Sequence, residues 1–253
     1  IIIEKQVTQK PTVLFRGCSG NAGLSNRIAS DLSNCGWFQV VTSGTPDYII
    51  SGEASGTTLK LDLANGANAP VASFQIPITN EGDTSHAAVD AVLNNRFDIP
   101  GVCRSRIVFT AAGGKNKEIY VCDYDGRNIQ RVSYNGNLSL EPVWTPDSRS
   151  VIYSFVGDSF THLIQQSMDD KNLKRRLTQY PGLNAGGAVS PDGRHIALVL
   201  ASGNQVDLYV RPVEGGALKR LTRNKAAEAS PCWSPDGKRI CFVSDETGRP
   251  LLY

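Results

Sequence analysis

The sequence predicts an α/β N-terminal domain followed by an all-β propeller, and three observations support this fold class. The first hundred residues alternate between strand-like and helix-like apolar patterns. Further on, a turn-rich unit repeats at the period of four-stranded propeller blades. Between these patterns, Ile99-Pro100-Gly101 is typical of a linker. We therefore expect a small α/β domain over residues 1–101 and a partial propeller of about three and a half blades over residues 102–253.

The composition is that of a globular protein and argues against several functional classes. Of 253 residues, 40% are hydrophobic, and 26 Lys and Arg nearly balance 24 Asp and Glu. No basic stripe with interleaved aromatic residues is present, so nucleic acid is not an expected partner. No run approaches the ~18 apolar residues of a membrane-spanning helix, so the chain is not expected to cross a membrane.

Elements of the first domain follow from apolar spacing. Leu24, Ile28 and Leu32 recur every four residues and predict a helix over residues 22–34, which Gly36 would end. A second helix is expected over residues 84–97, with Ala88, Val92 and Leu93 facing a sheet. Short β-rich runs predict the strands of that sheet at 12–15, 38–42, 48–52, 58–63 and 71–76.

The second half is organised by a repeated Pro-Asp turn. Its prolines, Pro146, Pro191 and Pro235, are 45 and 44 residues apart. Proline presets φ, aspartate bonds back to the backbone and glycine accepts a left-handed conformation, so Pro-Asp-Gly closes a hairpin. Apolar strands at 150–155, 195–200 and 239–243 follow each turn. Trp144 and Trp233 hold equivalent positions and are expected to pack between blades.

The ends of the repeat predict an open ring. The first unit, from about residue 106 to 133, has no Trp-x-Pro-Asp strand, and the last breaks off within residues 244–253. A propeller commonly completes its first blade with a strand from the far end of the chain. We expect a C-terminal truncation, and residues 1–253 alone are expected to associate through unpaired edges.

No catalytic or cofactor motif accompanies these elements. The sequence lacks G-x-S-x-G, H-E-x-x-H, Walker A and G-x-G-x-x-G patterns, and its six cysteines form no C-x-x-C pair. His86, His162 and His195 are expected to be ordinary surface or edge residues. Cys232 and Cys241 fall opposite one another if residues 233–240 form a hairpin, as a disulfide or as two buried thiols. Neither enzymatic activity nor a cofactor or metal is expected.

Several separate stretches resemble the TolB family. They are Asp31-Leu-Ser-Asn-Cys-Gly-Trp-Phe38, Ile99-Pro-Gly-Val-Cys-Arg-Ser-Arg-Ile-Val-Phe109, Ile119-Tyr-Val-Cys-Asp-Tyr-Asp-Gly126, the Trp-Thr/Ser-Pro-Asp units and Ser244-Asp-Glu-Thr-Gly-Arg-Pro250. The resemblance implies a six-bladed propeller in the Gram-negative periplasm, in the Tol-Pal system of envelope integrity and cell division. It also implies binding of the lipoprotein Pal at a propeller mouth and of TolA through the N-terminus.

Two candidate binding segments follow. Inner strands of different blades begin on one rim, so the mouth is expected at Leu140, Leu183, Gly186, Glu228 and Ala229. The resemblance places the TolA contact near the N-terminus, at Ile1, Ile2, Ile3, Glu4, Lys5, Gln6 and Val7. The alternative is the gating propeller of a serine oligopeptidase without its hydrolase domain. The N-terminal α/β domain ending in Ile-Pro-Gly favours TolB.

Overall fold

The computed structural model describes residues 9–203 and 205–253. The chain forms two compact units. The first runs to Arg106 and includes the loop Asp123–Arg127, and the second comprises Ile107–Cys122 and Asn128–Tyr253. The first unit is α/β and the second is all-β, which confirms the predicted fold class. None of the helices within the described residues has the length and apolar character needed to cross a bilayer.

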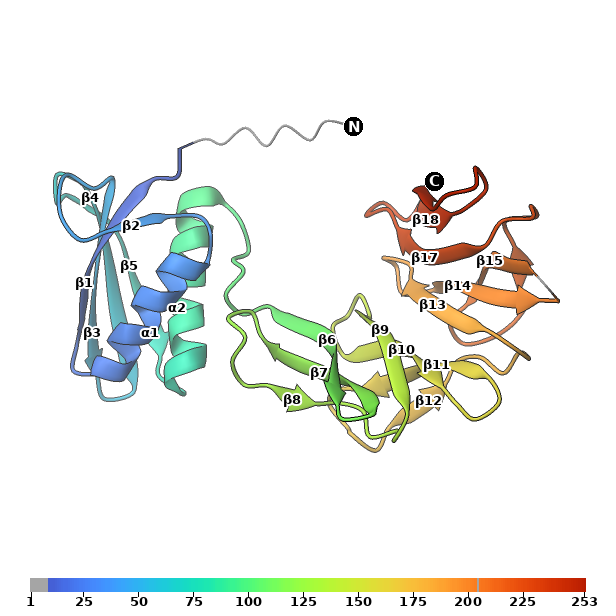
Figure 1. Ribbon diagram of the computed structural model, residues 1–253. Helices are drawn as coiled ribbons and strands as arrows, with labels where there is room; N and C mark the ends of the chain where they lie inside the picture. The colour runs from blue at the N-terminus through green and yellow to red at the C-terminus, as the bar shows by residue number, and fades with distance from the viewer. Residues whose placement is uncertain (1–8, 204) are drawn as a thin grey trace. The chain divides into compact units, whose positions relative to one another are not determined.

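A five-stranded mixed sheet forms one layer of the first unit (Figure 1). Its strand order is β2-β1-β3-β4-β5, with β1 parallel to both β2 and β3 and the other pairs antiparallel. A register shift interrupts β1 between Phe15 and Cys18. Gly17 lies in this shift with φ of +93°, a conformation that glycine adopts without strain. The strands are β1 (Thr12–Ser19), β2 (Gln39–Val41), β3 (Tyr48–Ser55), β4 (Thr58–Asn65) and β5 (Pro70–Pro77).

Two helices, α1 (Ala22–Asn34) and α2 (Glu81–Phe97), pack on this sheet. The side chain of Asn21 accepts from the backbone of Leu24 and caps α1, whose bounds agree with the prediction. Helix α2 begins earlier than predicted because Asn80 caps it in the same way through Asp83. The predicted inward faces of both helices are buried, in one core with Ile50, Leu59, Leu61 and Leu63 of the sheet.

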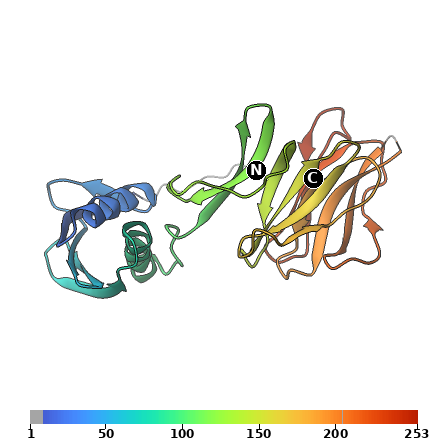
Figure 2. The same ribbon diagram turned by 90° about the horizontal axis from the view of Figure 1, so that it is seen from below.

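The strands of the second unit form sheets of seven, four and three strands, and the Pro-Asp repeat divides them into successive blades (Figures 1 and 2). The seven-stranded sheet comprises blades 1 and 2, which one parallel pair, Lys117 with Leu138, joins. Blade 1 contains β6 (Arg106–Gly113), β7 (Asn116–Asp123) and β8 (Gln130–Arg131). Blade 2 contains β9 (Leu138–Trp144), β10 (Ser150–Val156), β11 (Thr161–Ser167) and β12 (Lys174–Arg176). Blade 3 contains β13 (Asn184–Val189), β14 (His195–Ser202), β15 (Gln205–Pro212) and β16 (Lys219–Arg220). Blade 4 contains β17 (Glu228–Trp233), β18 (Ile240–Ser244) and β19 (Leu251–Leu252).

The predicted Pro-Asp turns join the first two strands of blades 2, 3 and 4 through the same hydrogen bonds. Asp147 accepts from the Thr145 hydroxyl at 2.6 Å and from the backbone of Arg149 at 3.0 Å. Asp192 and Asp236 repeat this arrangement in the next two blades. These bonds, the hydroxyl first, lower the pKa of each of the three carboxyls. The turns are structural, as the sequence predicts.

Hydroxyl groups and one tryptophan add further repeated contacts. Hydroxyl oxygens after the last strands of blades 1, 2 and 3 each accept one backbone N–H, at 2.9 to 3.0 Å, from β7, β11 and β15 respectively. These residues are Ser133, Thr178 and Thr222. This bond accounts for the hydroxyl residue that follows the fourth strand in each completed repeat. The Trp233 indole donates to the Ala188 carbonyl of the preceding blade at 3.0 Å. The inter-blade packing predicted for Trp233 is therefore confirmed.

Candidate functional site

The inner strands of blades 2, 3 and 4 share a kink near their start. Each shows a register shift against its hairpin partner. Glu141, Gly186 and Ser230 lie at these shifts, each five residues before the proline of its turn, with φ of 53°, 63° and 49°. The shift re-aims the strand and changes which side chains face outward. The strand starts are therefore geometrically equivalent, as a shared rim requires.

The predicted mouth residues differ in exposure. Leu140, Leu183 and Gly186 are half-buried and Ala229 is exposed. A Cβ atom on Gly186 would lie 2.8 Å from Cδ of Pro231, so the glycine permits close packing of β13 against β17. The Pro231 ring fills the space where a side chain of residue 186 would lie. An arginine at position 186 would therefore disturb the inner strands. Ala229 is the better position for testing the rim.

Glu228 lies inside the unit, because only 2% of its surface is exposed. Both of its carboxylate oxygens are buried and lack a hydrogen-bond partner among the described residues. Val206 and Ala227 pair in parallel, which places Asp207 and Glu228 as the next residues on neighbouring segments. Asp207 is fully buried and forms an ion pair with Arg220 at 2.6 Å. Glu228, which the sequence predicts at the propeller mouth, therefore lies at a buried, acidic position between blades 3 and 4.

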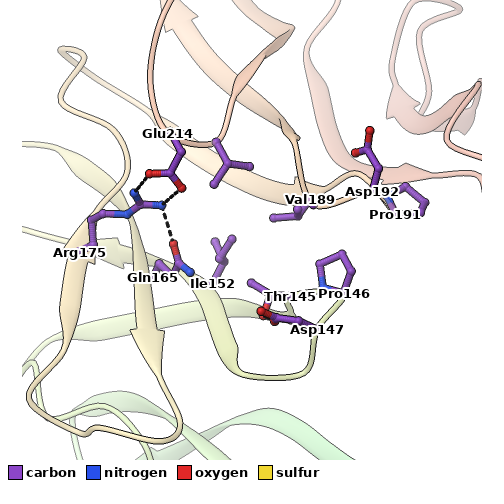
Figure 3. Close-up of a pocket in the computed structure, with 12 residues that line it drawn as sticks. Thr145, Pro146, Asp147, Ile152, Gln165, Arg175, Val189, Pro191, Asp192 and Glu214 are labelled. Atoms are coloured by element: carbon purple, nitrogen blue, oxygen red, sulfur yellow. Dashed lines mark hydrogen bonds and ion pairs between the residues drawn. The ribbon is translucent and has the colours of Figure 1, made fainter.

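A groove of about 510 Å³ lies at the turn end of blades 2 and 3 (Figure 3). Arg175 forms an ion pair with Glu214 at 2.7 Å, and a second nitrogen donates to Gln165 at 3.0 Å. Asp147 and Asp192 also line the groove, but their carboxylates are engaged in their own turns. No histidine or cysteine is among the described residues that line it. The groove offers polar contacts from Arg175, Gln165 and Glu214.

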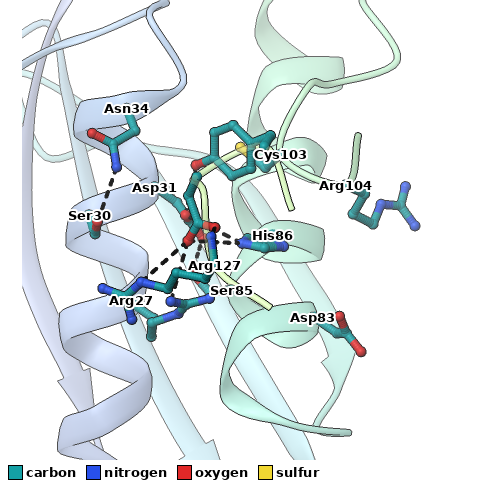
Figure 4. A network of polar contacts seen from close by, with 12 residues as sticks. Arg27, Ser30, Asp31, Asn34, Asp83, Ser85, His86, Cys103, Arg104 and Arg127 are labelled. Atoms are coloured by element: carbon teal, nitrogen blue, oxygen red, sulfur yellow. Dashed lines mark hydrogen bonds and ion pairs between the residues drawn. The ribbon is translucent and has the colours of Figure 1, made fainter. Parts of the chain in front are cut away.

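A buried polar cluster, which sequence reasoning missed, lies in the first unit (Figure 4). Asp31 of α1 accepts from the Tyr124 hydroxyl at 2.7 Å and from the Ser85 hydroxyl of α2. His86 of α2 is 3% exposed, and its Nε2 lies 3.6 Å from Asp31 and 3.9 Å from Asp125. The expectation that His86 is an ordinary surface or edge residue is wrong, because it lies between two buried carboxylates.

The charges of this cluster are largely compensated within it. Arg27 of α1 lies 3.3 Å from the Asp125 carboxylate, and Arg127 lies 3.6 Å from it. Ligand atoms of Asp31, His86 and Asp125 lie within 4.8 Å of one another, close enough for a metal ion. However, hydroxyl donors and two guanidinium groups already contact these carboxylates, and a metal cation beside Arg27 and Arg127 would be repelled. The arrangement fits an internal ion network that holds the loop Asp123–Arg127 to the α/β unit.

The domain junction is anchored by a carboxylate of α2. Asp90 accepts from the backbone N–H groups of Cys103 at 2.8 Å and Arg104 at 3.1 Å. Gly101 approaches so closely that a Cβ atom would lie 2.4 Å from the Asp90 carboxyl carbon. The residues that directly follow the predicted linker are therefore held against α2. Of the predicted N-terminal site, Ile1 to Val7 lie outside the described residues.

Comparison with known proteins agrees with the repeat and the fold. The family described as TolB beta propeller domain matches residues 97–253. The Tol-Pal system protein TolB of Francisella tularensis is 36% identical over 144 residues, which cover 55% of this chain and 32% of that protein. TolB of Anaeromyxobacter dehalogenans strain 2CP-1 is 34% identical over 150 residues, covering 59% and 34%. The matched stretch thus spans about a third of these relatives.

A solved structure extends the likeness to both units. The crystal structure of TolB from Acinetobacter baumannii matches with a TM-score of 0.85, covering 97% of this chain and 68% of that one. Its sequence identity is 21%, so this match bears on the fold. The family match covers more than half of the chain. Together with the Pro-Asp blades and the α/β unit, these matches show that the chain belongs to the TolB β-propeller domain family.

Proposed function

We propose that this chain is a non-enzymatic, protein-binding component of the Tol-Pal system in the periplasm. It binds a Pal-like lipoprotein at the inner-strand starts of the propeller, which we call the rim: Leu140, Leu183, Gly186 and Ala229. It contacts a TolA-like partner through residues 1–7. By this binding it takes part in envelope integrity and cell division. Glu228, although predicted with the rim, contributes to the packing beneath it because it is buried.

One observation supports the rim most directly: the inner strands kink at equivalent positions. The three kinked residues, Glu141, Gly186 and Ser230, have left-handed backbone conformations. Two of them are not glycine, and such a conformation costs an ordinary residue of order 1–3 kcal/mol. Strained backbone of this kind clusters at binding sites. The names of the matched relatives, Tol-Pal system protein TolB, support the choice of partner system.

Ala229→Arg tests the rim. Ala229 is exposed, so arginine adds bulk and charge at the rim without entering the core. We expect at least a tenfold weaker Kd for the soluble domain of a Pal-like lipoprotein, measured by isothermal titration calorimetry. The matched control is Ala217→Arg, the same substitution at an exposed position in the loop after β15. If circular dichroism shows that both variants are folded and their affinities are equal, the rim is not the binding site.

Deletion of residues 1–9 tests the N-terminal contact. The segment Ile1-Ile-Ile-Glu-Lys-Gln-Val7 is β-prone and suited to adding a strand to a partner's edge. We expect the deletion to weaken TolA binding and to leave the circular dichroism spectrum and Pal binding unchanged. TolA affinity that survives the deletion would exclude this segment as the contact.

A further inference from the structure

Cys232 and Cys241 face each other across the hairpin of blade 4. The register of β17 and β18 pairs Cys232 with Cys241, next to the pair formed by Trp233 and Ile240. Directly opposed residues of an antiparallel pair have Cα atoms about 4.5–5.5 Å apart. Disulfides bridge Cα separations of about 4.4–6.8 Å. The backbone therefore already holds these cysteines at bonding separation, as the predicted hairpin implies.

Their exposure separates these two thiols from the remaining cysteines. Both are exposed, which excludes the two buried thiols that the sequence left open. The other four cysteines are buried. Burial raises the pKa of the thiols of Cys18, Cys35 and Cys103, and a raised pKa leaves little thiolate, the reactive form. Cys232 and Cys241 are therefore the two thiols that an oxidant can reach, and they are opposed in the strand register.

The equivalent pairs in other blades show what this position requires. Val143 pairs with Ile152 in blade 2, and Ala188 pairs with Ala197 in blade 3. Each is the third residue before the proline of its turn, paired with the sixth residue after it, as are Cys232 and Cys241. Val143 and Ile152 belong to the apolar core between blades. The corresponding cysteines of blade 4 are exposed, and a disulfide, which is compact and uncharged, fits this face of the hairpin whether the face is exposed or packed.

We propose that Cys232 and Cys241 form a cross-strand disulfide, which makes the hairpin of blade 4 an oxidation site. The oxidant is a disulfide-bearing compound. One cysteine thiolate attacks a sulfur of that disulfide and forms a mixed disulfide, releasing one oxidant thiolate. The second cysteine thiolate attacks its partner's sulfur and displaces the other. Two protons leave the protein thiols, two electrons reduce the oxidant, and one S–S bond replaces another.

The disulfide constrains the hairpin. It closes a loop around the Pro235-Asp-Gly turn, so the unfolded chain loses conformational freedom while β17 and β18 keep their register. The proposal rests on the proposed periplasmic location only for the supply of oxidant in the cell, because that compartment is oxidising. Its chemistry can be tested without any partner protein, so its failure is distinguishable from failure of the proposed function.

The test uses the purified chain with oxidised and reduced glutathione. After oxidation, the unfolded protein is alkylated and digested, and peptides are identified by mass spectrometry. We expect alkylation to lose two of the six cysteines, with Cys232 and Cys241 joined within one chain. We also expect a higher urea midpoint for the oxidised protein than for the reduced one, and no such difference in Cys232→Ala.

Matched variants assign the bond. In Cys232→Ala and Cys241→Ala, the remaining cysteine should stay alkylatable or carry one glutathione, without an internal link. Cys122→Ala, which removes a buried thiol outside the hairpin, should oxidise like the parent. If the parent keeps six alkylatable cysteines in the oxidising buffer, or links these residues only between chains, the proposal is wrong.

Discussion

Arg220 places a guanidinium nitrogen 2.6 Å from the carboxylate of Asp207, whose side chain is fully buried. Blade 1 contains an equivalent pair, Arg131 and Glu118, at 2.9 Å. In blade 2 the position equivalent to Asp207 and Glu118 is occupied by His162, which lies near Arg176. One structural position between strands thus holds an ion pair in two blades and an imidazole in another.

Arg220→Met is expected to lower the free energy of unfolding by about 3 kcal/mol, because it leaves the buried Asp207 carboxylate without its countercharge. Urea unfolding followed by circular dichroism measures the loss. Arg223→Met, at an exposed position nearby, is the control and should change the free energy by less than about 0.5 kcal/mol. Equal losses in the two variants would show that the ion pair contributes nothing.

His162→Gln is expected to weaken the pH dependence of stability. Burial first, and the positive charge of Arg176 second, lower the pKa of His162. The unfolded chain therefore binds this proton at a higher pH than the folded chain, and stability falls as the pH drops below the ordinary imidazole value of about 6.5. The loss continues until the pH has passed through the lowered folded pKa.

Melting temperatures measured at about pH 7 and about pH 5 check this prediction. The difference between the two should be smaller in His162→Gln than in the parent protein. His195→Gln, which alters an exposed histidine, should keep the parent's difference. A His162→Gln variant as sensitive to pH as the parent would contradict the assignment.

Ser148→Gly is expected to stabilise blade 2 by about 0.5–1 kcal/mol, because the left-handed strain of about 1–2 kcal/mol exceeds the entropy that glycine adds to the unfolded chain. Ser148 has φ of 58° at the turn position where blades 3 and 4 have Gly193 and Gly237. A side chain is unfavourable in this left-handed conformation, whereas glycine adopts it freely. Urea midpoints measure the gain, and Gly193→Ser should produce a loss of similar size. A destabilised Ser148→Gly protein would contradict the argument.

Tyr124→Phe is expected to release the loop Asp123–Arg127 from the α/β unit. The Tyr124 hydroxyl donates to the buried Asp31 carboxylate at 2.7 Å, and hydrogen bonds to charged groups contribute about 1.5–3 kcal/mol. Hydrogen exchange of the loop amides should become faster. Tyr134→Phe, which alters a tyrosine that is 69% exposed, should leave exchange unchanged. Unchanged loop protection in Tyr124→Phe would show that the bond does not hold the loop.

Local patterns predicted local structure well. Four-residue spacing gave helix α1 with its bounds, and the Pro-Asp turns fixed the pairing of Cys232 with Cys241, because a hairpin determines its own register. Apolar spacing predicts a later start for α2 than the structure has, because the polar first turn capped by Asn80 carries no apolar periodicity. The shared kinks at Glu141 and Ser230 were also missed, since neither residue type signals a left-handed backbone.

The polar cluster could not be predicted for a different reason. Asp31 and Tyr124 are 93 residues apart, and no spacing rule joins a helix residue to a turn so distant in sequence. The sequence predicts the turn itself, but its Tyr-Asp pair gives no sign that the turn packs against the helices of the α/β unit, to which it belongs. Glu228 shows the same limit, because a charged residue at a strand start was expected to face a partner and is buried instead.

The loop Asp123–Arg127 has a practical consequence for anyone who dissects this protein. It belongs to the α/β unit, although it is encoded within the first blade. A fragment that stops at residue 101 or 106 would lose Tyr124 and Asp125, so Asp31 would lose the Tyr124 hydroxyl and Arg27 would lose the Asp125 carboxylate. A single cut therefore cannot separate the two units cleanly. A self-sufficient α/β fragment would need the loop supplied in trans or grafted through a short linker.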